Sequence, residues 1–155
     1  MRLRRVLQRL TIMTSDDSQS EQIRDIIDTF EMLGDWDQRY EYLVELGERM
    51  APMNPADKSD ANRVMECMST VHVAAKPEAG AFRFAGDCDT AIIKGVVALL
   101  VGLFSGKTQA QIEETDVDTL FEGLKLEEHL SPNRHVGVYA IVNKMRRQAA
   151  LAAGA

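Results

Sequence analysis

Cysteine is scarce in this sequence, which has only two cysteines, at positions 67 and 88, among 155 residues. Two are too few for the disulfide framework of a small secreted domain. They do not form a CxxC pair, so the closely repeated thiolate ligands typical of zinc and iron–sulfur sites are missing. Because a secretory signal is also missing, we expect a reducing compartment in which Cys67 and Cys88 are both thiols at rest.

Long apolar runs are missing as well. The longest, over residues 96–104, is interrupted by Gly102 and is far too short to cross a bilayer. The N-terminal segment MRLRRVLQRLTIM is broken by arginines, whereas a secretory signal needs a continuous apolar centre. We therefore predict a cytoplasmic protein that makes no membrane contact, with organelle targeting by the basic N-terminus as the alternative.

An excess of positive charge is also absent, because the net charge is -6. The chain has no overall basic field with which to hold nucleic acid or an anionic membrane, and it would attract a basic partner surface. Apolar residues make up 45% and charged residues 27% of the sequence, a balance typical of a globular domain. We interpret residues 1–20 as a flexible basic and polar extension and residues 21–150 as one domain.

Helical periodicity marks the first part of this domain. Residues 23–33 carry apolar side chains at helical spacing, with Ser18 or Ser20 as the candidate cap before them. Gly34 suits the end of that helix. A second apolar stripe at helical spacing over residues 36–46 predicts another helix directly after it, so the two form a helical hairpin.

The period of the pattern changes after a proline-containing loop. Val71 and Val73 alternate with His72 and a small residue, and Phe82 and Phe84 alternate in the same way after the turn-like segment KPEAG. Alternation on both sides of a turn predicts an antiparallel hairpin with one apolar face.

Helices are predicted again after the hairpin. Residues 92–104 are apolar over much of a helical circumference, as in a central buried helix, and Asp87 or Asp89 is its candidate cap. Ser131 followed by Pro132 is a sharp start signal for the last helix. The order of two helices, two strands and further helices predicts an α+β fold with a small antiparallel sheet flanked by helices.

Cys67 stands on the loop that leads into the first predicted strand, and two interpretations apply to it. A free cysteine is commonly a buried, inert apolar residue. A residue on such a loop, however, is more often presented to a partner than one inside a helical stripe. No activating base is evident nearby, yet a cysteine thiol is nucleophilic enough to attack an already activated sulfur. Both interpretations stay open at this point.

Cys88 lies just beyond the second strand, at the same end of the hairpin as Cys67, so the two thiols could approach each other. Cys88 is either a residue without a chemical role or a resolving thiol. A metal site built on both cysteines, His72 and either Asp87 or Asp89 lacks the ligand spacing of known sites, so we expect none. His129 and His135 have no serine or aspartate at a spacing that would indicate a catalytic triad.

Four segments, taken together and in their order along the chain, resemble a known family. They are DWDQRYEYLVELGERM, NRVMECMSTVHV, FAGDCDTAIIKGVVALLVGLFSG and HLSPNRHVGV. They resemble, in turn, the second helix, the loop with the acceptor cysteine and the strand after it, the central helix, and the start of the last helix of the SufE/CsdE sulfur-acceptor proteins. These proteins are partners of cysteine desulfurases in iron–sulfur cluster assembly. The resemblance covers residues 23–147.

The resemblance implies a site. In the family the loop cysteine attacks the persulfide on the desulfurase and carries the sulfane sulfur to an assembly scaffold, and Cys67 matches that cysteine. Asp89 matches the family aspartate of the GDxD turn, and Arg134 matches the arginine after SP, so both are implied supporting residues. The implied fold is shared with iron–sulfur scaffold proteins. The chain departs from the family pattern at Glu66, usually glycine, at His72, usually tryptophan, and at Cys88, more often serine.

The resemblance also implies the partners. The expected partners are a cysteine desulfurase of the SufS/CsdA kind and a scaffold of the SufBCD kind, and the protein itself is expected to be a monomer or weak homodimer. Pyridoxal phosphate belongs to the desulfurase, so we expect no cofactor and no metal here, and no stand-alone enzymatic activity. Two other functions stay open: a non-catalytic adaptor, and a metal-binding or redox-switch protein that uses Cys67 and Cys88.

Overall fold

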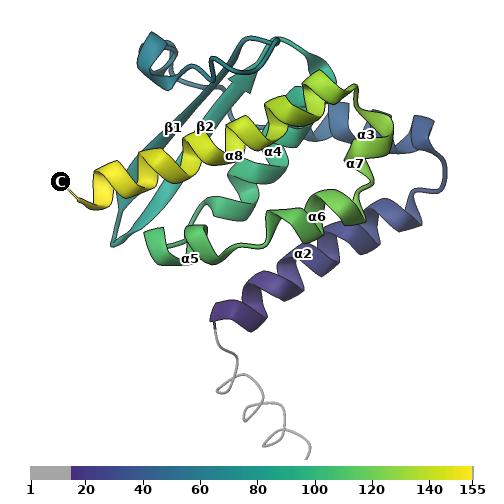
Figure 1. Ribbon diagram of the computed structural model, residues 1–155, viewed down its shortest axis with the longest axis horizontal. Helices are drawn as coiled ribbons and strands as arrows, with labels where there is room; N and C mark the ends of the chain where they lie inside the picture. The colour runs from purple at the N-terminus through teal and green to yellow at the C-terminus, as the bar shows by residue number, and fades with distance from the viewer. Residues whose placement is uncertain (1–14, 155) are drawn as a thin grey trace, which may run out of the picture.

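The computed structural model describes residues 15–154 and has a two-stranded antiparallel sheet flanked by helices (Figure 1). The helices are α2 (Ser15–Met32), α3 (Trp36–Arg49), α4 (Ala91–Phe104), α5 (Gln109–Glu114), α6 (Val117–Gly123), α7 (Leu126–His129) and α8 (Pro132–Ala153). The strands are β1 (Val71–Glu78) and β2 (Ala81–Cys88), preceded by the 3-10 turns η1 (Pro55–Asp57) and η2 (Asp60–Asn62). The predicted α+β class is confirmed.

Helix α2 begins earlier than the sequence suggested. We expected its cap at Ser18 or Ser20, but residues 15–20 are already helical, so the last part of the segment interpreted as a flexible extension belongs to the helix. The helix ends as predicted before Gly34, whose φ of +78° is left-handed. The rest of the predicted extension, residues 1–14, lies outside the described residues.

The two strands form a regular hairpin that is longer than predicted. Its register runs from the pair Val71 and Cys88 to the turn. The turn itself consists of Ala79 and Gly80, which both have positive φ, 52° and 80°, as a two-residue hairpin turn of type I′ requires. Part of the segment KPEAG therefore belongs to β1. Pro77 is tolerated there because a strand of a two-stranded sheet has an unpaired edge.

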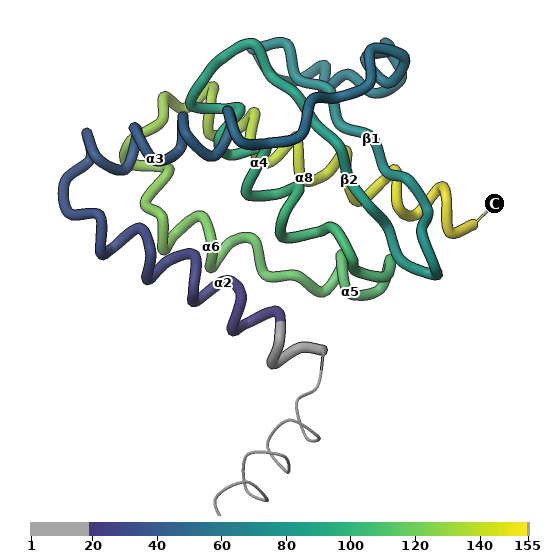
Figure 2. Tube along the Cα trace, turned by 180° about the vertical axis from the view of Figure 1, so that it is seen from behind, coloured from purple at the N-terminus to yellow at the C-terminus, as the bar shows by residue number. Residues whose placement is uncertain are grey.

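Helix α4 is the central helix, as its apolar circumference predicted. It packs against β2, where the rings of Phe84 and Phe104 lie 6.1 Å apart, and it crosses α3 at very short distance. A methyl group on Gly95 would lie 2.1 Å from the Leu43 carbonyl oxygen, so a glycine is needed at this crossing. Helix α8 runs along β1 beside α4, and the two views show both helices on one side of the hairpin (Figure 1, Figure 2).

Neither of the aspartates that we expected to cap α4 does so. The N-cap is Thr90, whose side chain makes no capping hydrogen bond. Asp89 instead accepts a hydrogen bond from the Thr70 backbone N–H at 3.0 Å, and Asp87 pairs with Lys58 at 2.7 Å. Both carboxylates thus bind residues of the segment before β1, and Asp87 also pairs with Lys94 of α4 at 3.3 Å. These tertiary contacts override the local capping signal.

The last third of the described chain was predicted in part. Helix α8 starts as expected, with Pro132 in its first turn and Ser131 as the N-cap, whose hydroxyl accepts from the Arg134 backbone N–H at 3.3 Å. Helices α6 and α7 were not predicted; α6 lies beside α2 in both views (Figure 1, Figure 2). Across residues 15–154, no helix combines the length and the apolar character that crossing a bilayer requires.

Candidate functional site around Cys67

The chain between η2 and β1 forms a tight turn over residues 64–70, which we call the Cys67 loop. At its start the Val64 backbone N–H donates to the Val71 carbonyl at 2.9 Å, and Val64 itself is fully buried. The Cys67 backbone N–H then donates to the Val64 carbonyl at 3.3 Å, which closes a turn. The cysteine is therefore held three residues from a buried anchor.

The other end of the Cys67 loop is fastened to the end of the hairpin through Asp89. Its carboxylate accepts from the Thr70 N–H at 3.0 Å, and its own backbone N–H donates to the Thr70 carbonyl at 3.2 Å. The hydroxyls of Ser69 and Thr90 lie 2.7 Å apart. A hydrogen bond to a charged carboxylate is stronger than one between neutral groups, so Asp89 is the main polar anchor of this end.

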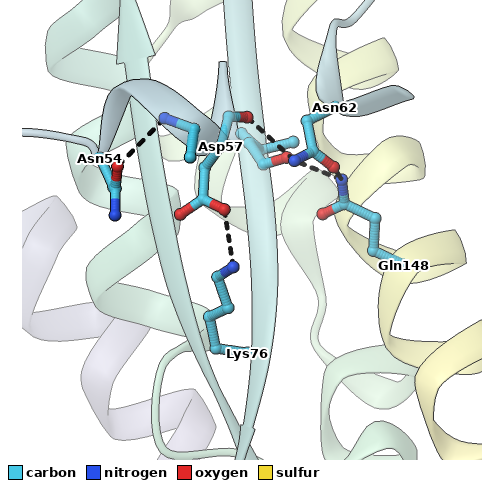
Figure 3. A network of polar contacts seen from close by, with 7 residues as sticks. Asn54, Asp57, Asn62, Lys76 and Gln148 are labelled. Atoms are coloured by element: carbon cyan, nitrogen blue, oxygen red, sulfur yellow. Dashed lines mark hydrogen bonds and ion pairs between the residues drawn. The ribbon is translucent and has the colours of Figure 1, made fainter. Parts of the chain in front are cut away.

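The segment before the Cys67 loop is held by a polar network, which Figure 3 shows. The carboxylate of Asp57 accepts from Lys76 on β1 at 2.6 Å. The Asn62 side-chain amide donates to the Asp57 carbonyl at 2.9 Å and accepts from Gln148 on α8 at 3.2 Å. Because this network ties the segment to both β1 and α8, the loop leaves from a fixed position relative to the last helix.

The Cys67 thiol points inward, toward the second turn of α8. The residue is only 9% exposed and belongs to the hydrophobic core. Its sulfur lies against Gly137: a methyl group on Gly137 would be 3.0 Å from Cys67 Sγ and 3.6 Å from its Cα and Cβ. The thiol thus rests in a space on the helix surface that a glycine leaves open.

Exposed apolar side chains stand on the Cys67 loop and beside Gly137 on α8. Met65 is 70% exposed and Met68 is 80% exposed, and they flank Cys67 on the same loop. Val136, which precedes Gly137 on α8, is 60% exposed. Large apolar side chains that gather on a surface commonly mark a contact site for another protein. We call these three residues the apolar rim.

Charged side chains complete the surroundings of the Cys67 loop. Arg134 is exposed on the first turn of α8, and its spacing to Gly137 places both on one side of that helix. Among residues 15–154 the Arg134 side chain takes part in no ion pair. Glu66 approaches Arg147 of α8 at 4.0 Å, but both side chains are more than half exposed. An exposed pair at this distance contributes little stability.

Cys88 has a different environment. It is 6% exposed at the end of β2, and its sulfur accepts a hydrogen bond from the Thr90 N–H at 3.4 Å. Burial raises the pKa of Cys88 to about 11, and the negative charges of Asp89, a Cys67 thiolate and Asp87 act in the same direction. A thiol with such a pKa is a poor nucleophile at neutral pH because it is almost wholly protonated. Both cysteines are free thiols.

The other chemical groups of the described chain do not converge on the thiols. Within residues 15–154 no three histidines, cysteines or carboxylates are grouped so that they could hold a metal ion. His129 stacks on Trp36 with ring centroids 3.4 Å apart, and His135 packs edge-on against Tyr139. The site is therefore a thiol with structural neighbours rather than a thiol with a base beside it.

The sequence interpretation named Cys67, Asp89, Arg134 and Cys88, and the structure brings the first two together through the Cys67 loop. It missed Gly137, which forms the space for the thiol. A signal was available, because glycine is disfavoured inside a helix and an isolated one often has a packing reason. The position of that glycine opposite Cys67 depends on the tertiary contact between loop and helix, which no local pattern encodes.

Comparisons with known proteins identify the family of this chain. A family model described as "SufE: Fe-S metabolism associated domain" matches residues 24–149. The chain belongs to the SufE family. A SufE-like protein of Rhizobium etli is 35% identical over 134 residues, which make up 84% of this chain and 90% of the relative. Membership in the SufE family associates the chain with iron–sulfur metabolism.

A solved structure shares the fold. The solution structure of a hypothetical protein from Thermus thermophilus superimposes with a TM-score of 0.72 and 22% sequence identity. The match covers 86% of this chain and 97% of the other. At this identity the likeness concerns the architecture alone, and it agrees with the helix-flanked hairpin of the SufE member described here.

Proposed function

We propose that this SufE-family protein accepts sulfane sulfur on Cys67 from the persulfide of a cysteine desulfurase and passes it to an iron–sulfur assembly scaffold. The observation that carries the proposal is the position of Cys67: a thiol on a short loop that also carries two exposed methionines of the apolar rim, in a chain of this family. Pyridoxal phosphate belongs to the desulfurase in this proposal, and the chain described here brings no cofactor of its own.

The chemical step is thiol exchange. The Cys67 thiolate attacks the outer sulfur of the donor persulfide, and the bond between the two donor sulfurs breaks. The electron pair leaves with the desulfurase thiolate, which takes up a proton, and Cys67 becomes a persulfide. No oxidant or reductant is consumed. The same exchange, with Cys67 as the leaving thiolate, delivers the sulfur to the next acceptor.

The resting geometry explains why a partner is needed. At 9% exposure the Cys67 sulfur offers little surface to a donor, so the thiol must turn away from α8 before it reacts. Contact of the desulfurase with Met65 and Met68, one on each side of the cysteine in the loop, would shift the loop backbone that holds Cys67. Docking of the desulfurase and exposure of the thiol are therefore coupled through the loop backbone. Without a bound desulfurase, the protein keeps its thiol away from other reactants.

Asp89 and Arg134 support this reaction in different ways. Asp89 fixes the Thr70 end of the Cys67 loop, so the loop moves about a defined hinge. Arg134 is exposed beside the apolar rim and offers a positive charge to an acidic group of the desulfurase. We expect Arg134 to affect partner binding, whereas Asp89 affects the position of the thiol.

Desulfurase stimulation tests the proposal. Turnover of cysteine by a cognate desulfurase should rise when the wild-type protein is added. It should stay at the basal level with Cys67→Ser, because the sulfur then has no acceptor. Cys88→Ser is the matched control and should stimulate like wild type. Stimulation that survives Cys67→Ser would contradict the proposal and indicate an adaptor that acts by binding alone.

A further inference from the structure

We propose that Gly137 is a positioning residue for Cys67: its missing side chain lets the thiol rest against α8, and this contact sets how readily the thiol reacts. The inference deepens the proposed function, since it takes Cys67 as the reacting group. It concerns the exposure of the thiol itself, so it can be tested without any sulfur donor.

The neighbours of Gly137 differ from those of other helical glycines. A methyl group on Gly95 would meet the backbone of Leu43, and on Gly102 it would meet nothing within 4 Å. On Gly137 the three nearest atoms all belong to Cys67, with the sulfur closest at 3.0 Å. The part of the molecule that this glycine accommodates at closest range is therefore the candidate acceptor residue.

An alanine at position 137 would force one of the two partners to move. Carbon atoms in optimal contact lie about 3.5–4.0 Å apart and sulfur is larger than carbon, so a separation of 3.0 Å is too short. Helix α8 is fixed in the core next to this point, because Val138 and Ile141 are fully buried. Cys67 stands on a loop whose tip is exposed. An outward movement of the thiol therefore costs less free energy than a movement of α8.

The first test measures alkylation of Cys67 in the folded protein. Iodoacetamide labelling of Cys67 is followed by mass spectrometry in a Cys88→Ser background, with and without Gly137→Ala. Because overpacking by one methyl group has a clear energetic cost, we expect Gly137→Ala to speed labelling by about fivefold or more. Gly102→Ala is the matched control, since it adds the same methyl group to a helix in open space, and should leave the rate unchanged.

A second measurement separates this effect from general loss of stability. The free energy of unfolding is determined for Gly137→Ala, Cys67→Ala and the double variant. If the added methyl group meets the sulfur, Gly137→Ala should destabilise the protein less when Cys67 is already alanine, and the two changes should be non-additive. Equal labelling rates in the first test, or additive effects in this cycle, would overturn the proposal.

These outcomes are independent of sulfur transfer. A protein that fails to gain sulfur from a desulfurase could still show the faster labelling and the coupling, and then the proposed function would fail while the role of Gly137 stands. The reverse result, sulfur transfer without any coupling, would reject the role of Gly137 alone.

Discussion

The two cysteines of this protein are almost equally buried, yet they stand on backbones of different kinds. Cys88 is at 6% exposure as the last residue of a paired strand, accepts a backbone hydrogen bond and is close to two carboxylates. Cys67 is at 9% exposure on a turn, rests on a glycine and is flanked by exposed methionines. Side-chain burial alone does not separate an inert thiol from an available one. What separates them is the cost of moving the backbone that holds each.

The largest effect predicted from this comparison is a difference in labelling rate. At neutral pH, iodoacetamide should label Cys67 at least roughly a hundredfold faster than Cys88, because the Cys88 pKa of about 11 leaves little thiolate and its strand must open first. Peptide mass mapping of the folded protein over time measures both rates at once. Comparable rates would show that the two environments are equivalent, against this account.

A smaller effect is expected from the anchor of the Cys67 loop. Asp89→Ala removes the acceptor of the Thr70 N–H and should lower the free energy of unfolding by about 1–3 kcal/mol. It should also speed labelling of Cys67, because that end of the loop is then held by fewer hydrogen bonds. Asp89→Asn keeps an oxygen acceptor and is the matched control, so chemical denaturation should place it between wild type and alanine.

The raised pKa of Cys88 also predicts a loss of stability at alkaline pH. The unfolded thiol loses its proton near the ordinary value of 9.0, whereas the folded thiol keeps it until about 11. Stability from this group is therefore complete below pH 9 and is lost as the pH rises toward 11. Between pH 8 and 11, the free energy of unfolding should fall less steeply for Cys88→Ser than for wild type. Parallel curves would show that the thiol is not shielded.

The smallest effect concerns Glu66, which meets Arg147 at 4.0 Å on the surface. Glu66→Gln should change the free energy of unfolding by less than about 0.5 kcal/mol and leave the labelling rate of Cys67 within error. A large acceleration of labelling, especially one that high salt reproduces in wild type, would mean that this ion pair holds the loop closed. The packing of the thiol on Gly137 would then be the lesser restraint.

The sequence predicted the fold well where local patterns and tertiary packing agree. Alternation identified the hairpin, and the serine and proline at the start of α8 located that helix. The sequence-based prediction failed at Asp89, because a carboxylate placed like a helix cap accepts a hydrogen bond from Thr70 of the Cys67 loop instead. The candidate thiol could be named from its loop and the family resemblance. Its contact with Gly137 could not, since 70 residues separate the two and only the packed helix brings them together.

The central claim, that Cys67 carries sulfur, is tested most directly by intact mass. The wild-type protein, Cys67→Ser and Cys88→Ser are each incubated with a cognate desulfurase, pyridoxal phosphate and cysteine. The intact mass of each is then measured by mass spectrometry before and after treatment with a reductant. We predict a gain of one sulfur atom in wild type and Cys88→Ser, lost on reduction, and no gain in Cys67→Ser. A sulfur gain that persists in Cys67→Ser, or its absence from wild type beside an active desulfurase, would contradict the account.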